Sequence, residues 1–148
     1  MSDYLSLRIE DFPFQKTIPT RWGDNDMLGH LNNVVYNRMI ETVVVGFTMG
    51  PLEIDWQAAP SYPLVVESLC RFHRPLSFPE TVTAGLRAGR VGGTSVTYEI
   101  ALFGEGHQMP ASTGHFIHVF IDRETHRSVS IPEAIRARIE MYGIRRQA

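Results

Sequence analysis

The sequence predicts a single α+β domain in which an antiparallel β-sheet of about five strands wraps around one long apolar helix, with a short helix at the C-terminus. Three observations predict this fold. Residues 32–47 carry apolar side chains at helical spacing, residues 64–121 contain four segments with the alternation typical of strands, and no repeat or linker divides the 148 residues. We therefore assign residues 1–148 to one domain, because this length is typical of a single core.

The predicted helix runs from Asn32 to about Phe47. Its apolar side chains recur every four residues in two adjacent stripes: Val35, Met39, Val43 and Phe47, and beside them Tyr36, Ile40 and Val44. Asn32 is a suitable N-cap, and Gly46 or Gly50 can end the helix. The periodicity has to override the strand propensity of the three valines at residues 43–45. Because such a helix is apolar over much of its circumference, we expect it to lie inside the curled sheet.

Five segments have the pattern of β-strands: residues 14–20, 64–72, 81–91, 95–103 and 111–121. Pro13 and Pro19 restrict the first of them to a short or edge strand, because proline cannot donate a ladder hydrogen bond. Residues 115–121 are apolar on both faces, which predicts cover from the helix on one side and from another layer or subunit on the other. Pro132 and Glu133 begin a short terminal helix.

The composition excludes several classes of partner. The net charge is −2 and the sequence pI is about 6.3, so no electrostatic attraction to nucleic acid or to an anionic membrane is expected. The most apolar stretch, residues 34–49, contains Arg38 and Glu41 and is too short and too charged to span a bilayer. The single cysteine, Cys70, excludes an intramolecular disulfide. We expect a soluble cytoplasmic protein with no nucleic-acid or membrane partner.

Polar residues gather in the loop that precedes the long helix, where Asp24, Asp26, His30, Asn32 and Asn33 lie close together in the sequence. Carboxylate and amide oxygens at this place can cap the helix, and the residues alone favour that role. Alternatively, the unpaired N–H groups of the first turn polarise a substrate carbonyl while a carboxylate attacks it or activates water. A metal site is not expected, because the histidines of the chain show no ligand spacing.

The segment at residues 21–36 has the sequence RWGDNDMLGHLNNVVY. It resembles the signature R-[WFY]-x-D-x-D-x-x-G-H-[VL]-N-N-x-x-Y of the 4-hydroxybenzoyl-CoA thioesterase-like family of hotdog proteins, and looser similarity extends over nearly the whole chain. The resemblance implies a hotdog fold and hydrolysis of an acyl-CoA thioester to the free acid and CoA. In that family the acidic residue matching Asp26 is the nucleophile or general base. The backbone N–H matching that of Asn33 polarises the thioester carbonyl.

The resemblance also points to substrate-binding residues: Gly29, His30, Asn32, Arg74, Thr94 and Ser95. We expect His30 and Asn32 to shape the loop as well, and Arg74 to bind the CoA phosphates, a role for which Arg71 and Arg90 are further candidates. Asp24 is expected to support the loop rather than to take part in the chemistry. No cofactor is implied beyond the CoA thioester, which is the substrate. The resemblance implies a homodimer or homotetramer in which sheets join edge to edge and the active site lies between subunits.

The segment departs from the founding type of the family at two places. Met27 replaces a proline after the acidic residue, and Asn32 and Asn33 replace aromatic residues at the helix entry, so a benzoyl substrate is not expected. Two other functions stay open: a hotdog enoyl-CoA hydratase or dehydratase, and a non-catalytic module that binds acyl-CoA or an acyl carrier. The hydratase motif Gly-Asp-x-Asn-Pro-x-His lacks its proline here. The sequence also leaves open the acyl group and the choice between CoA and acyl carrier protein.

Overall fold

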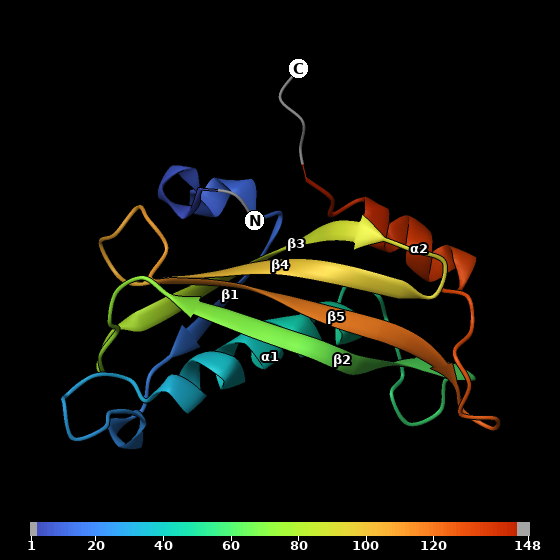
Figure 1. The fold of residues 1–148 in the computed structure, drawn as a ribbon, viewed down its shortest axis with the longest axis horizontal. Coiled ribbons are helices and arrows are strands. Elements are labelled where there is room, and N and C mark those ends of the chain that lie inside the picture. Colours follow the sequence, from blue (N-terminus) through green and yellow to red (C-terminus); the bar gives the residue numbers. More distant parts are fainter. Residues whose placement is uncertain (1–2, 145–148) are drawn as a thin grey trace.

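The structure, a computed structural model, describes residues 3–144 (Figure 1). Its elements are, in chain order, η1 (Tyr4–Ser6), η2 (Ile9–Asp11), β1 (Phe14–Pro19), η3 (Trp22–Asp24), α1 (Asn33–Met49), β2 (Ser61–Phe72), β3 (Thr81–Val91), β4 (Ser95–Phe103), β5 (Ser112–Asp122) and α2 (Glu133–Glu140). One strand, a loop, a long helix, four strands and a short helix follow one another as the sequence predicts. The α+β prediction is confirmed, and the arrangement is that of the hotdog fold.

All five strands form one antiparallel sheet in the order β1-β3-β4-β5-β2. β1 is an edge strand, as its prolines predict, and Pro19 stands at its last position opposite Thr81. β2 forms the other edge, and its register shifts between Val65 and Glu67. Figure 1 shows α1 lying along one face of the curved sheet, with the N-terminal segment on the other face. α2 adds Ile139 to the same core as α1, and the Tyr142 ring just after it meets the Phe47 ring of α1 with centroids 5.0 Å apart.

α1 is held by burial against the sheet. Five of its apolar side chains are completely buried, Met39, Ile40, Val43, Val44 and Phe47. They belong to the same apolar core as sheet side chains from β3 and β4: Val82, Ala84, Leu86, Val96, Tyr98, Ile100 and Leu102. Each large apolar side chain removed from water contributes roughly 1.5–3 kcal/mol, whereas valine disfavours a helix by less than about 1 kcal/mol, so burial decides the structure of residues 43–45. Neither α1 nor any other helix within residues 3–144 is long and apolar enough to cross a membrane.

Both ends of α1 lie where the sequence predicts. The Asn32 side chain accepts a hydrogen bond from the Val34 N–H at 3.0 Å and so caps the first turn. Gly50 is the C-cap, and its N–H donates to the Gly46 carbonyl at 2.9 Å. α2 begins one residue later than expected, because Pro132 is its N-cap rather than its first residue. The N-terminus of α1 is therefore fixed directly after the loop that carries the motif.

The face of the sheet opposite α1 is only partly covered. Phe12 packs so closely on Gly85 that a Cβ atom there would lie 2.7 Å from the Phe12 side chain, and its ring contacts the Phe103 ring with centroids 6.1 Å apart. In β5, Ile117 and Val119 are only half-buried, so no second layer covers them within residues 3–144. Cover by another subunit at residues 115–121 stays a prediction.

His118 is a polar side chain in an apolar part of the core. It is 3% exposed, and its ring packs edge-on against Phe116 and Tyr98, with centroids 5.0 and 5.8 Å apart. Its Nδ1 has no hydrogen-bond partner within residues 3–144. Burial lowers the pKa of His118 from 6.5 to about 4, because the charged ring would lose its hydration without gaining a counter-charge. The folded protein therefore holds the neutral ring at neutral pH.

We predict that His118 makes the fold sensitive to mild acid. Between pH 6.5 and about 4 the unfolded chain binds a proton on this residue that the folded chain does not, so stability falls as pH falls through this window. The full shift corresponds to about 3 kcal/mol. Urea denaturation of His118→Phe, which keeps an aromatic ring without a titrating nitrogen, should give a flatter profile of stability against pH. Equal slopes for the two proteins would contradict this account.

Candidate functional site

A cavity of about 300 Å³ opens where the loop of residues 21–32 meets the first turn of α1 and the end of β2. In Figure 1 this loop and the start of α1 lie at the end of the sheet where β2 terminates. The cavity is lined by Asp26, Leu28, His30, Leu31, Asn33, Tyr36, Phe72, His73, Arg74 and Pro75. The structure thus brings together four residues that the sequence predicts for the site, namely Asp26, His30, Asn33 and Arg74.

Asp26 lies in a tight turn at this cavity. Its N–H donates to the His30 carbonyl at 2.8 Å, and its carbonyl accepts from the Gly29 N–H at 3.1 Å. Gly29 has a φ of 78°, a conformation that favours glycine. The Oδ1 atom of Asp26 accepts from the Leu28 N–H at 2.8 Å, whereas Oδ2 accepts no hydrogen bond within residues 3–144. The turn therefore holds an exposed carboxylate with one free oxygen at the cavity.

Asn33 is the first residue of α1, and its backbone N–H donates no hydrogen bond within residues 3–144. The first N–H groups of a helix have no partner in the helix itself, and they carry the positive end of the helix dipole. The sequence alone allows either Asp26 or Asn32 to cap α1, and in the structure Asn32 is the cap. The Asp26 carboxylate accepts only from its own turn, so it is not used to cap α1.

Asp24 is buried beneath the loop and is 2% exposed. Its carboxylate accepts from the Arg38 guanidinium through both oxygens at 3.0 Å, from the Arg21 N–H at 2.8 Å and from the Arg21 guanidinium at 3.1 and 3.2 Å. These bonds, that of Arg38 above all, hold the pKa of Asp24 at about 2 against the cost of burial. The Asp24 carbonyl accepts from the Asn32 N–H at 2.9 Å. Asp24 thus joins the loop to α1.

Two further bonds tie the loop to the chain after β2. The Leu31 N–H donates to the Leu76 carbonyl at 2.7 Å, and the Ser77 hydroxyl donates to the Gly29 carbonyl at 3.0 Å. The segment that carries Arg74 is thereby held against the loop that carries Asp26. Both walls of the cavity are thus joined by hydrogen bonds to backbone carbonyls.

Six lining residues are not predicted as site residues from the sequence: Leu28, Leu31, Tyr36, Phe72, His73 and Pro75. The Tyr36 hydroxyl accepts from the Leu76 N–H at 2.9 Å, and its ring meets the Phe72 ring with centroids 5.0 Å apart. His73 Nε2 shares a hydrogen bond of 2.8 Å with the Thr113 hydroxyl, and burial, aided by the charge of Arg71, lowers the pKa of His73. Tyr36 ends the motif and His73 precedes Arg74, so proximity to motif residues is the signal that could have identified them.

The remaining predicted residues lie elsewhere. Gly29 and Asn32 shape the loop but do not line the cavity. Thr94 and Ser95 lie at the start of β4. The cavity lies at the other end of this strand, because Phe72 at the end of β2 and Leu102 near the end of β4 both pair with Ser112 of β5. Within one chain these two residues are therefore at the opposite end of the sheet from Asp26, and their contact with substrate stays a prediction.

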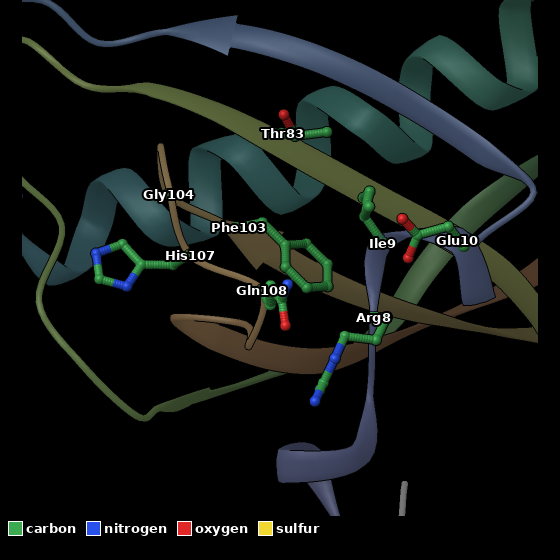
Figure 2. Close-up of a pocket in the computed structure, with 8 residues that line it drawn as sticks. All are labelled: Arg8, Ile9, Glu10, Thr83, Phe103, Gly104, His107 and Gln108. Atoms are coloured by element: carbon green, nitrogen blue, oxygen red, sulfur yellow. The ribbon is translucent and has the colours of Figure 1, made fainter.

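A second cavity, of about 340 Å³, lies between the N-terminal segment and the loop after β4 (Figure 2). It contains none of the predicted site residues, and in Figure 2 the His107 ring points away from the Phe103 ring. Within residues 3–144 no three His, Cys, Asp or Glu side chains are grouped as metal ligands. The two residues predicted to be catalytic, Asp26 and Asn33, therefore line the Asp26 cavity and not this second one.

Comparison with known proteins identifies the family and agrees with the fold. Residues 20–139 match the family model of the thioesterase-like superfamily. The PA5185 protein from Pseudomonas aeruginosa is 37% identical with a TM-score of 0.88, over 95% of this chain and 98% of that one. The PA2801 protein of the same organism, a candidate thioesterase, is 35% identical with a TM-score of 0.79, over 85% and 97%. A thioesterase from Thermus thermophilus solved with coenzyme A and zinc is 27% identical with a TM-score of 0.79, over 93% and 99%. No curated protein matches the sequence.

We predict that Arg38→Met destabilises the protein more than Arg21→Met does. The Arg38 side chain is 37% exposed and that of Arg21 is 68% exposed, so the bond from Arg38 to the buried Asp24 carboxylate is less screened by water. Removing one partner of such a pair costs up to about 3 kcal/mol. Urea denaturation at pH 7 measures both losses, with Arg127→Met at an exposed arginine as the control. Equal losses for Arg38→Met and Arg21→Met would contradict the prediction.

Proposed function

We propose that this chain, which belongs to the thioesterase-like superfamily, hydrolyses an acyl-CoA thioester to the free acid and CoA. One observation carries the proposal: the Asp26 carboxylate and the Asn33 end of α1, with its unpaired N–H, line the same cavity. A nucleophile or base and an electrophilic donor are the two groups that thioester cleavage needs. The related thioesterase that is solved with coenzyme A supports CoA as the thiol carrier. The narrower assignment to the 4-hydroxybenzoyl-CoA thioesterase-like family is part of this proposal.

In the proposed reaction the thioester carbonyl oxygen accepts a hydrogen bond from the Asn33 N–H, and the N-terminus of α1 stabilises the negative charge that develops on this oxygen. Asp26 acts in one of two ways. As a nucleophile, its carboxylate oxygen bonds to the acyl carbon, the C–S bond breaks, CoA leaves as the thiolate, and water hydrolyses the resulting anhydride. As a general base, Asp26 takes a proton from a water molecule whose oxygen attacks the acyl carbon directly; the C–S bond then breaks, and the departing thiolate of CoA takes up a proton. Both routes release the acid and CoA.

We also propose that two copies of the chain pair along β2, alone or within a tetramer. β2 is an edge strand with β5 on one side only. Exposed apolar side chains surround the cavity and continue along this strand: Met27, Leu28, Val34, Leu64, Val65, Val66 and Phe72. A second copy that extends the sheet at this edge would cover apolar surface and place a further wall beside the cavity. Sedimentation should therefore give at least twice the mass of one chain, and a fully active monomer would contradict the pairing.

We predict that Asp26→Asn abolishes most thioester hydrolysis, because the amide has the shape of the carboxylate without its nucleophilic or basic oxygen. The expected loss in kcat is at least about 100-fold. Free-thiol release is measured over short, long, branched and aromatic acyl-CoA substrates. Asp55→Asn is the matched control, since Asp55 is also exposed and also accepts N–H groups of its own turn, from Gln57 and Ala58, outside the Asp26 cavity.

Wild-type hydrolysis by Asp26→Asn would overturn the proposed mechanism. Two results would favour the other functions that the sequence leaves open. Addition of water to crotonyl-CoA without release of free thiol would indicate a hydratase. Binding of acyl-CoA without either reaction would indicate a non-catalytic module.

A further inference from the structure

Arg74 lines the Asp26 cavity, and its guanidinium has no hydrogen-bond partner within residues 3–144. Arg74 is half-buried, its Nε and Nη2 atoms are sealed from solvent, and neither has a hydrogen-bond acceptor within residues 3–144. The other arginines of this range that are not exposed each donate to at least one acceptor: Arg8, Arg38, Arg87, Arg123, Arg136 and Arg138. Among residues 3–144, Arg74 is therefore the one half-buried arginine whose guanidinium has no hydrogen-bond acceptor.

Packing, rather than polar contacts, holds Arg74 in place. The backbone at Gly104 lies so near that a Cβ atom there would be 2.9 Å from Arg74 Nη2 and 2.7 Å from the Leu76 side chain. The Glu80 carboxylate is close to Gly104 as well, but it accepts from the Ser77 N–H at 2.9 Å and forms no ion pair with Arg74. Glu80 therefore compensates the positive charge of Arg74 only in part, and the buried guanidinium nitrogens without an acceptor destabilise the empty protein. A bound anion would remove this cost.

The CoA part of the substrate does not supply that anion. When the thioester lies at Asp26, the extended pantetheine arm carries the CoA phosphates more than about 10 Å away. Arg74 and Asp26 line one cavity of about 300 Å³, which is at the lower end of the size range of ligand sites. The phosphates would therefore lie outside the cavity, and the sequence-based expectation that Arg74 binds them does not fit this arrangement. The acyl group is the part of the substrate within reach of Arg74.

We propose that Arg74 binds a carboxylate at the far end of the acyl group, so that the site takes short dicarboxylic acyl-CoA thioesters. The proposal rests on the thioesterase function proposed above. Guanidinium and carboxylate match each other in charge and geometry, and Arg74 Nη1 is not among the atoms sealed from solvent. A spacer of about two or three methylene groups keeps the substrate carboxylate away from the Asp26 carboxylate, which would repel it at short range.

Isosteric substrates test this directly. Succinyl-CoA is compared with 4-methylpentanoyl-CoA, and glutaryl-CoA with 5-methylhexanoyl-CoA, because each pair differs only in a carboxylate against an isopropyl group. Free-thiol release, corrected for hydrolysis without enzyme, gives kcat/KM. The wild-type protein should prefer the carboxylate member by about 10- to 100-fold, the effect of one charge-assisted hydrogen bond. Arg74→Met should remove the preference, so that the two members of each pair have the same kcat/KM within about 3-fold.

Two controls keep the outcome clear. Arg127→Met, at an exposed arginine outside the cavity, should keep the wild-type preference. Arg74→Lys, which keeps the charge, should keep part of it. Equal turnover of both members by the wild-type protein would overturn the inference without any variant and leave the thioesterase function standing. An equal loss on both members in folded Arg74→Met would also overturn it. Absence of thiol release from all four substrates and from other acyl-CoA thioesters would overturn the thioesterase function and this inference together.

Discussion

The candidate site depends on the buried carboxylate of Asp24. Guanidinium groups from Arg21 and Arg38 enclose it, and the Asp24 carbonyl accepts from the N–H of the residue that caps α1. The loop is therefore bonded to α1 at two points, through the Arg38 side chain and through Asn32. Asp26 and Asn33 lie on either side of this connection. Their positions relative to each other follow from an ion pair that takes no part in the chemistry.

Unpaired polar groups gather where the loop, α1 and β2 meet. The Asn33 N–H, one oxygen of Asp26 and the sealed nitrogens of Arg74 have no partners within residues 3–144, although the backbone around them is well bonded. Asp26 and Asn33 are exposed, so water completes their bonding in the empty protein, and a bound substrate would take the place of that water. Of these groups only the Arg74 nitrogens are buried without a partner, at a cost to stability. His118 and Tyr98 are counterexamples, because the unpaired Nδ1 and the unpaired hydroxyl lie in the apolar core and affect stability instead.

Local patterns predict the fold well, because its elements are set by periodicity and capping. The four-residue spacing from Val35 to Phe47 identifies α1 despite its valines, and Asn32 caps it. The site is predicted less completely. Tyr36 has the spacing of a core residue, and only a contact across 40 positions with the Leu76 N–H shows it at the cavity. The residue types of the acidic loop by themselves favour a role in capping α1. Only the resemblance of the motif to the thioesterase family favours a catalytic role for Asp26. Resemblance also selected Thr94, which the sheet register places far from that residue within one chain.

The central claim is that Asp26 and the Asn33 N–H act on the same thioester carbonyl. It is tested most directly by the amide chemical shift of Asn33 in ¹⁵N-labelled protein, titrated with an acyl-CoA analogue in which a methylene group replaces sulfur, so that a ketone stands for the thioester. A hydrogen bond to this ketone should move the Asn33 N–H resonance downfield more than that of any other residue of the loop or of α1. A saturating complex in which the Asn33 resonance stays unchanged, while resonances near Thr94 move, would contradict the account.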